Sequence, residues 1–380
     1  MSFFKNTLTA LHKKEINLIE KIRPGYSKYI VEMILKEYEK KMNTYLTIRT
    51  TPKRSEQFYY SELNSRIQDE LAIIIQGGLY AKDNFTVETC KVYRKSFKNA
   101  KIIVSTWENE DTEIINELKE LGVFVIQSKK PKFTGIGNIN LQVKSTYEGL
   151  KYAKKIKAKY VLKTRTDQRL QKNNLYEYFI SLLEKFPVVK DGVLKLPQTQ
   201  RIIVLQSPVA ASMFMPLHVS DFLYFGRIED VTRIFEIDEE KISETKEERF
   251  EREKKLINEN SAMEFHHLEA PEVKLMETYI LNYQKDLKPE ELLSVYNFWN
   301  LLKEDLLVVS YNDVGFLWGK DGRYYNENEL LHNYDLGDSD LTRKKYVLDF
   351  SNWLSIYCGV LEYSKEYEKI PMLPACDIIM

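Results

Sequence analysis

The chain has 380 residues, of which 43% are hydrophobic and 29% charged, a composition typical of a soluble globular protein with one large core or two smaller ones. Lysine plus arginine equal aspartate plus glutamate at 56 each, so we expect no nucleic-acid partner, which would require a broad basic surface. The three cysteines, Cys90, Cys358 and Cys376, form neither a metal-binding motif nor a disulfide framework, and this favours a reducing cytoplasm.

The N-terminal part predicts helices. Apolar residues recur at helical spacing across residues 7–45, and Pro24 and Gly25 interrupt the pattern. We expect neither a signal peptide nor a membrane span here, because no long apolar stretch occurs. Residues 1–65 contain 12 basic and 7 acidic side chains. This excess allows weak attraction to an anionic inner-membrane surface, although a solvated helical face is the favoured interpretation.

Strands and helices then alternate over about 95 residues. The expected strands are apolar runs at 71–78, 100–107, 122–128 and 160–164, with helices at 88–97, 111–121 and 141–158 between them. This order predicts a parallel sheet flanked by helices. Ligands bind such a sheet beyond the carboxyl ends of its strands, and here those ends are polar or contain glycine. The sequence therefore predicts a pocket at that edge of the sheet.

Beyond residue 175 the pattern is mixed. Residues 193–209 indicate strands and residues 271–287 a helix. Between them, residues 229–259 contain 12 acidic and 7 basic side chains and predict a long charged helical insertion, of the kind that usually forms a solvated face. No flexible linker marks a boundary. We therefore expect the second half to pack against the first sheet.

The fourth predicted strand ends in charge. In "YVLKTRTDQRL", three cations surround one carboxylate, and strand alternation directs Lys163, Arg165 and Asp167 to one face. A carboxylate at a strand end can hold a divalent cation that bridges phosphate oxygens, and the cations can also pair with phosphates directly. Alternatively, Asp167 forms a salt bridge with an arginine that merely closes the loop. The residue types alone leave both interpretations open.

Four stretches carry a resemblance to a known family: "IIIQGGLY", "YRKSFKNAKIIVSTWENED", "NINLQVKSTYEGLKYAKKIKAKYVLKTRTDQRL" and "FMPLHVSDFLYFGR". Together with "APEVKLMETYI", they resemble the WavE lipopolysaccharide synthesis family over roughly residues 70–280. The resemblance implies an α/β, GT-A-like (nucleotide-diphospho-sugar transferase) fold, with a mostly parallel sheet flanked by helices. We expect four parts, namely a helical N-terminal extension (1–65), a nucleotide-sugar-binding half (66–175), an acceptor-side half (176–330) and a C-terminal extension packed on the core (331–380), of which the first and last lie outside the resemblance.

The resemblance also implies a donor site. The residues it places at the nucleotide-sugar are Gln76, Gly77, Ser105, Thr106, Trp107, Asn138, Asn140 and Gln142. Asp167 would stand where such enzymes keep a metal-binding aspartate, and the metal would be Mn²⁺ or Mg²⁺. This sequence departs from the usual pattern, because Arg165-Thr166-Asp167 has one carboxylate and Leu141 stands where an arginine is expected. Lys163 or Arg165 is therefore expected to do part of the work of the metal.

The later motifs supply further candidates. His218 is a candidate second metal ligand and Asp221 a candidate contact for the acceptor. A transfer that inverts the anomeric centre needs a carboxylate base, and Asp221 or Glu272 could serve. Structural alternatives remain, since a lone histidine often has a structural role and a glutamate in the first helical turn often only interacts with the helix dipole. The adjacent pair His266 and His267 is expected to be structural or exposed.

These observations predict a glycosyltransferase. It would move a sugar from a nucleotide-activated donor to a lipopolysaccharide, capsule or other surface-glycan acceptor. We expect it in the cytoplasm, with peripheral contact at the cytoplasmic face of the inner membrane as a further option. Two alternatives are a sugar nucleotidyltransferase, for which "QGGLYAKDNFT" is a weak match to the expected loop, and a non-catalytic scaffold of a glycan assembly complex.

Overall fold

The computed structural model describes residues 18–379, apart from residues 20, 22, 24, 44, 46–49, 61–67, 190–191, 210, 321–322 and 327–345. The chain divides into two compact units, Met1–Pro52 and Lys53–Met380. In the first unit, helix α2 (Tyr26–Met42) starts after Gly25, which has a positive φ of 86°. The helix predicted before residue 18 lies outside the described residues. Within the described part of the chain, no helix combines the length and apolar character needed to cross a membrane.

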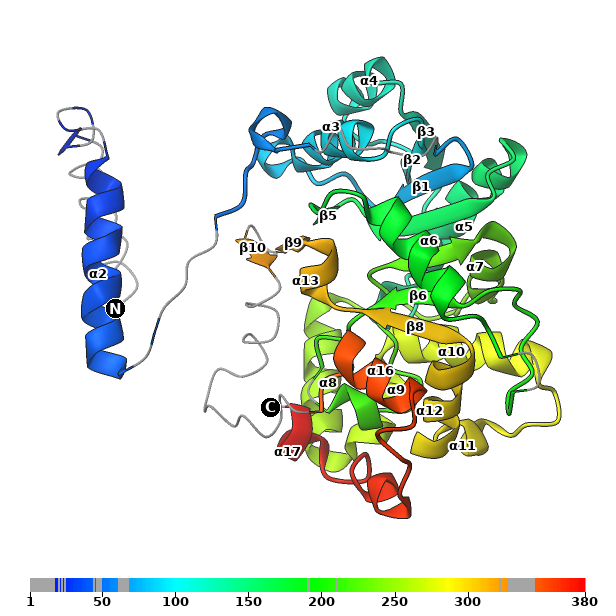
Figure 1. Cartoon of the computed structure of the whole chain (residues 1–380). Helices are drawn as coiled ribbons and strands as arrows, with labels where there is room; N and C mark the ends of the chain where they lie inside the picture. The colour runs from blue at the N-terminus through cyan, green and yellow to red at the C-terminus, as the bar shows by residue number, and fades with distance from the viewer. Residues whose placement is uncertain are drawn as a thin grey trace. The chain divides into compact units, whose positions relative to one another are not determined.

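A seven-stranded sheet forms the centre of the second unit (Figure 1). Its strands are β1 (Leu71–Gln76), β2 (Lys101–Trp107), β3 (Phe124–Ser128), β4 (Tyr160–Arg165), β6 (Ile202–Leu205), β7 (Tyr224–Arg227) and β8 (Leu306–Val309). The spatial order is β3-β2-β1-β4-β7-β6-β8, and only β7 runs antiparallel to its neighbours. The predicted fold class, a mostly parallel sheet flanked by helices, is confirmed. Both halves of the sequence contribute strands to this one sheet.

Helices surround the sheet. They are α3 (Phe85–Ser96), α4 (Thr112–Glu120), α5 (Ile139–Lys155), α6 (Leu175–Lys185), α7 (Ile228–Ile234), α8 (Lys246–Glu259), α9 (Ala262–Glu269), α10 (Pro271–Tyr283), α11 (Pro289–Leu292), α12 (Val295–Glu304), α13 (Tyr311–Val314), α16 (Phe350–Tyr357) and α17 (Ala375–Ile379). Helix α5 packs directly on β1 and β2. Its Gly149 makes this possible, because a Cβ atom there would lie 2.7 Å from Cγ2 of Ile74.

A second, three-stranded sheet explains why β4 ends in charge. It consists of β5 (Gln168–Leu170), β9 (Phe316–Lys320) and β10 (Arg323–Asn326), in the order β10-β9-β5. The chain leaves β4, turns at Thr166 and Asp167, and enters β5, which pairs antiparallel with β9. The polar stretch is thus the turn that connects the two sheets. The backbone carbonyl of Asp167 accepts a hydrogen bond from the Gly319 amide of β9.

The prediction of one long charged helix across 229–259 is wrong. Helix α7 ends at Ile234, residues 235–245 are not helical, and α8 begins at Lys246 behind a capping box formed by Thr245 and Glu248. The intervening segment instead hydrogen-bonds to the first turn of α5. Asn140 accepts from the Glu240 amide (3.0 Å) and donates to the Glu240 carbonyl (2.7 Å). Tertiary hydrogen bonds therefore override a composition that favours helix.

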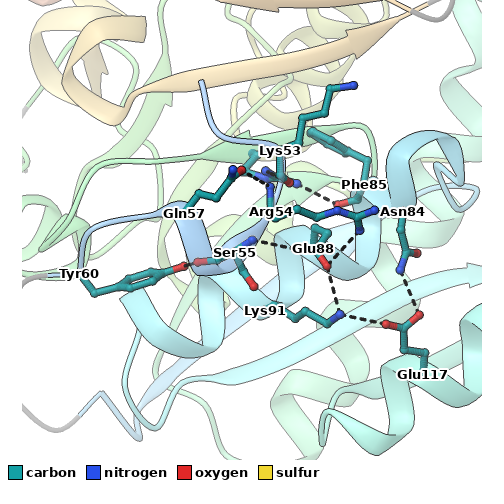
Figure 2. A network of polar contacts seen from close by, with 11 residues as sticks. Lys53, Arg54, Ser55, Gln57, Tyr60, Asn84, Phe85, Glu88, Lys91 and Glu117 are labelled. Carbon is teal, nitrogen blue, oxygen red and sulfur yellow. Dashed lines mark hydrogen bonds and ion pairs between the residues drawn. The ribbon is translucent and has the colours of Figure 1, made fainter. Parts of the chain in front are cut away.

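The segment that opens the second unit is fixed to α3 by a buried carboxylate (Figure 2). Glu88, whose side chain is 2% exposed, accepts from the Ser55 amide (2.8 Å) and pairs with Lys91 (3.1 Å) and Arg54 (3.5 Å). Lys91 also pairs with Glu117 of α4 at 3.0 Å. Burial alone would raise the pKa of Glu88, but these donors and cations outweigh it and hold the pKa below its usual value.

Candidate functional site

A cavity of about 290 Å³ lies at the carboxyl ends of β1, β2 and β4, the edge that the sequence predicts for ligand binding. It is lined by Gln76, Gly77, Gly78, Tyr80, Trp107, Gly137, Asn138, Leu141, Gln142, Arg165, Thr166, Asp167 and Asp221. We call it the first cavity. Most of the predicted functional residues line this one space, namely Gln76, Gly77, Trp107, Asn138, Gln142, Arg165, Asp167 and Asp221. Both departures from the family pattern, at Leu141 and at Arg165, also fall on its wall.

Four predicted donor-site residues are not among the lining residues. Ser105 is buried, and its hydroxyl donates to the Ser145 carbonyl (2.6 Å), which joins β2 to α5. Thr106 donates to Glu110 (3.1 Å). Asn140 is occupied by the backbone of the segment after α7. The fourth is Lys163, which lies beneath the loop that carries Asp221.

Lys163 is buried and stabilises the loop that carries Asp221, one of the residues that line the first cavity. Its ammonium group donates to the Asp221 carbonyl (2.5 Å) and lies 5.6 Å from the ring centre of Tyr224 and 5.8 Å from that of Phe235. Burial lowers the pKa of Lys163 to about 8, although the Asp221 charge opposes this shift. The side chain therefore positions the backbone of Asp221, and its contacts are structural.

The end of β1 is tied to the end of β4. Gly77 has a φ of 114°, and the carbonyl of Gly78 accepts a hydrogen bond from the Thr166 hydroxyl (2.6 Å). A Cβ atom at Gly77 would lie 3.2 Å from that hydroxyl oxygen. The positive φ and the close approach both require glycine, so the two strand ends come together as one surface of the cavity.

The N-terminus of α5 borders the same space. Asn138 precedes the helix in the left-handed conformation (φ 66°), and Leu141 and Gln142 in the first turn line the cavity. Among the described residues, the buried Nε2 of Gln142 has no hydrogen-bond partner. A helix N-terminus carries partial positive charge and free N–H groups, and together with this unpartnered amide it forms a site suited to an anion.

Arg165 and Asp167 form a bidentate ion pair on the cavity wall. Arg165 Nε lies 3.0 Å from Asp167 Oδ1 and Nη2 lies 2.9 Å from Oδ2. The indole Nε1 of Trp318 also donates to Oδ2 (3.0 Å). The guanidinium lies 5.7 Å from the ring centre of Phe222 and 6.0 Å from that of Trp318. Within the described part of the chain Nη1 has no partner, so the guanidinium keeps donors for a ligand.

The carboxylate of Asp167 does not fit a divalent cation as it is placed. Both of its oxygens already accept from Arg165 and Trp318, and a metal bound there would sit beside a guanidinium. His218 is no freer, since Nδ1 lies 3.2 Å from the Ser207 hydroxyl and Nε2 lies 3.3 Å from Glu272 Oε1. No three His, Cys, Asp or Glu side chains of the described residues come together as a metal-ligand set.

Glu272 stands at the start of α10, where Pro271 occupies the first helical position. It is partly buried, and this burial, together with the negative charge of Asp221, raises the pKa of Glu272 to about 8. Burial lowers the pKa of His218 to about 4. At neutral pH the 3.3 Å contact between them therefore joins a neutral imidazole to a mostly protonated carboxyl group. His218 and Glu272 line a second cavity.

Comparison with known proteins identifies the family. A family model described as WavE lipopolysaccharide synthesis matches residues 71–370. The chain belongs to the WavE lipopolysaccharide synthesis family. The match begins at the first residue of β1 and includes every residue that lines the two cavities. The resemblance inferred from the motifs is therefore confirmed, and it extends about 90 residues further than those motifs.

Other comparisons add little for this WavE protein. A search of curated proteins finds no matching relative. Among solved structures, one similar chain is a Bacillus anthracis protein named as a glucose-1-phosphate thymidylyltransferase, in complex with sucrose. It is 10% identical, with a TM-score of 0.32, and the alignment covers 78% of this chain and 98% of that one. A likeness of this size carries no argument about function.

The motifs of this WavE protein did not reveal several residues that line the first cavity or hold its lining residues in place. Gly137 could have been found, because the spacing in "GIGN" indicates a backbone that needs glycine, and its φ is 60°. Tyr80 lies inside a stretch that carried the resemblance. Trp318, which holds Asp167, lies 151 residues away and gave no local signal.

Proposed function

We propose that this WavE protein is a glycosyltransferase that moves a sugar from a nucleotide-activated donor to a lipopolysaccharide or other surface-glycan acceptor. The family assigns lipopolysaccharide synthesis, and the reaction is our inference. The observation that carries the inference is the clamped guanidinium of Arg165, which faces the same cavity as the N-terminus of α5. The mostly parallel sheet supports the GT-A-like assignment. From the cysteine content and the basic excess of residues 1–65 we also propose a cytoplasmic location, with weak contact at the inner membrane.

The first cavity suits a nucleoside diphosphate group. Departure of the nucleotide leaves negative charge on its terminal phosphate, and a fixed cation beside that oxygen lowers the barrier. Arg165 can supply the charge because nearby carboxylates, of which Asp167 is the strongest, outweigh the effect of burial and raise its pKa. Trp107 and Tyr80 add aromatic rings for a base or sugar to pack against.

Chemistry at the sugar requires removal of one proton. The acceptor hydroxyl oxygen bonds to the anomeric carbon, the bond from that carbon to the phosphate oxygen breaks, and its electron pair stays on the phosphate. A carboxylate takes the hydroxyl proton. Asp221 lines the first cavity, and Glu272 lies within electrostatic reach of it. Arg165 thus stabilises the negative charge on the leaving phosphate, and a carboxylate removes the proton from the attacking hydroxyl group.

The residues that line the first cavity favour glycosyl transfer over the reaction of a sugar nucleotidyltransferase. That reaction calls for cations on the loop after the first strand, where they would contact a triphosphate. The described lining residues from this loop are Gly77, Gly78 and Tyr80, whereas the lining cation comes from β4.

Turnover of nucleotide-sugars tests the proposal. Purified protein would be incubated with UDP-, GDP- and CMP-sugars, with and without a surface-glycan extract, and release of nucleoside phosphate would be measured. We expect release with one nucleotide class and an increase when the acceptor is added. Folded protein that neither binds nor hydrolyses any donor would sink the proposal. Pyrophosphate release from a nucleoside triphosphate and a sugar phosphate would instead identify a nucleotidyltransferase.

A further inference from the structure

A second cavity of about 340 Å³ lies on the other side of the start of α10. It is lined by Val209, His218, Arg249, Glu253, Phe265, His266, Glu269, Ala270, Pro271, Glu272 and Lys320. Its volume falls within the range for small-molecule sites. Of its lining residues, only Glu272 takes part in the chemistry proposed above.

Only a thin wall separates the two cavities. Gly137 lines the first cavity, and a Cβ atom on it would lie 2.5 Å from Cγ of Pro271, which lines the second. The next residue, Glu272, also lines the second cavity, and its pKa responds to Asp221 and Arg165 of the first. Trp318 and Lys320 on β9 connect them again, since Trp318 bonds Asp167 and Lys320 lines the second cavity.

The chemistry of the second cavity is mixed polar and aromatic. Phe265 presents a partly buried ring to the space, and its neighbour His266 is 5% exposed. In the described part of the chain, Nε2 of His266 has no hydrogen-bond partner. A buried imidazole nitrogen without a partner carries a desolvation cost that a ligand hydroxyl would relieve.

The charges of this cavity do not select an anion. Arg249 already pairs with Glu253 (2.5 Å), and Glu269 contacts Arg252. Lys320 lies 5.0 Å from the ring centre of Trp318. The cavity therefore contains charged groups of both signs, neutral imidazoles and one aromatic ring. The hydroxyl groups and the C–H face of a pyranose ring can interact with all of them.

We propose that the second cavity binds a neutral saccharide, the acceptor end of the glycan, with its reacting hydroxyl beside Glu272 at the wall shared with the first cavity. This assignment rests on the proposed function and names the acceptor site for it. Phe265 stacks on the sugar ring, Glu253 and His266 bind hydroxyl groups, and Glu272 takes the hydroxyl proton when transfer occurs. The attacking oxygen then enters the first cavity from the α10 side.

Ligand-observed NMR on the full chain tests this site without a known acceptor. The probes are methyl glycosides of glucose, galactose, mannose and N-acetylglucosamine, each titrated with and without saturating UDP. We expect saturation transfer from at least one glycoside in both conditions. Phe265→Ala should weaken that binding about fivefold or more, as expected when an aromatic contact at the centre of a site is lost. Phe250→Ala is the matched control, because Phe250 is 62% exposed on the neighbouring helix α8.

The results of these titrations support or contradict the assignment of the second cavity as a saccharide site. If Phe265→Ala fails to fold, Glu253→Gln replaces it, because that change keeps the shape and removes one carboxylate charge. Absence of binding by every glycoside, displacement of the sugar by UDP, or equal binding in wild type, Phe265→Ala and Glu253→Gln would each overturn the assignment. Failure of the glycosyltransferase proposal looks different. In that case no nucleotide-sugar is bound or turned over, whatever the glycosides do.

Discussion

Arg165 and Asp167, two residues apart in the chain, form a bidentate ion pair with donor–acceptor distances of 3.0 Å and 2.9 Å. The sequence left two interpretations open, a salt bridge that closes the loop or an acid that serves a ligand. The structure shows the salt bridge at the turn between two sheets, and both of its residues line the first cavity. Asp167 therefore fixes the position of Arg165, and Arg165 presents the charge.

Replacement of Arg165 by lysine should lower nucleotide release by roughly 100-fold, the scale associated with loss of one preorganised group at a developing oxyanion. Lysine keeps the positive charge but cannot form the two parallel hydrogen bonds to Asp167 that hold the guanidinium in place. Steady-state release of nucleotide would be compared with that of Lys119→Gln, an exposed cation on α4. Activity within about threefold of wild type in Arg165→Lys would contradict this role.

Removal of divalent cations should leave activity largely unchanged. Asp167 has both oxygens bonded to Arg165 and Trp318, so the donor set at the strand end does not fit a metal ion. Nucleotide release would be measured after dialysis against EDTA and again after addition of Mn²⁺ or Mg²⁺. Loss of activity with EDTA and full recovery with Mn²⁺ would show that Asp167 exchanges its partners for a metal when the donor binds.

Features that neighbouring residues determine can be predicted from the sequence, whereas features that depend on residues far apart in the chain cannot. The first four strands follow from local apolar runs, and the edge that binds ligand follows from their order, so Gln76 and Trp107 could be placed at strand ends from the sequence, whereas Gln142 was placed by the family resemblance. The role of Asp167 could not, because it depends on Trp318 in a different sheet. Neither could the second cavity be foreseen, since α8, α9, α10 and β9 come together there only in the folded chain.

Glu272 should control the pH dependence of turnover. As a base it must be ionised, so kcat/KM should rise with pH through about 8, where its pKa lies. Glu272→Gln should lower kcat about 100-fold or more and abolish this limb of the profile. Asp221→Asn should move the limb to lower pH, because the Asp221 charge is what helps to raise the pKa. An unchanged limb in Glu272→Gln would assign the base to Asp221 or to another group.

The same carboxyl group should make stability depend on pH. Glu272 keeps its proton to about pH 8 in the folded protein, whereas in the unfolded chain it loses the proton near the ordinary glutamate pKa of 4.5. Between these values the folded state binds more protons, so the free energy of unfolding falls as pH rises from about 4.5 to 8.

Glu272→Gln should remove this slope, so its stability relative to wild type should increase with pH. Urea unfolding at about pH 5 and about pH 8 measures it, with exposed Glu251→Gln on α8 as the control. A wild-type slope that persists in Glu272→Gln would show that other groups cause it.

Asn138 and Asn140 should have separable roles, although the family resemblance implied the same one for both. Asn140 makes two hydrogen bonds to the backbone of Glu240 and does not line the first cavity. Asn140→Ala should therefore destabilise the fold by about 1–3 kcal/mol, the cost of leaving these partly buried backbone groups unpaired. Asn138 lines the cavity in the left-handed conformation, and Asn138→Gly removes its side chain while keeping that backbone accessible.

Thermal unfolding and UDP titration of both variants distinguish the two roles. Asn140→Ala should unfold at lower temperature, with faster proteolysis of residues 235–245, and bind UDP normally while folded. Asn138→Gly should keep its stability within about 1 kcal/mol and bind UDP less tightly. The opposite assignment of the two effects would return Asn140 to the donor site. It would also mean that the segment after α7 departs from helix for some cause other than its hydrogen bonds to Asn140.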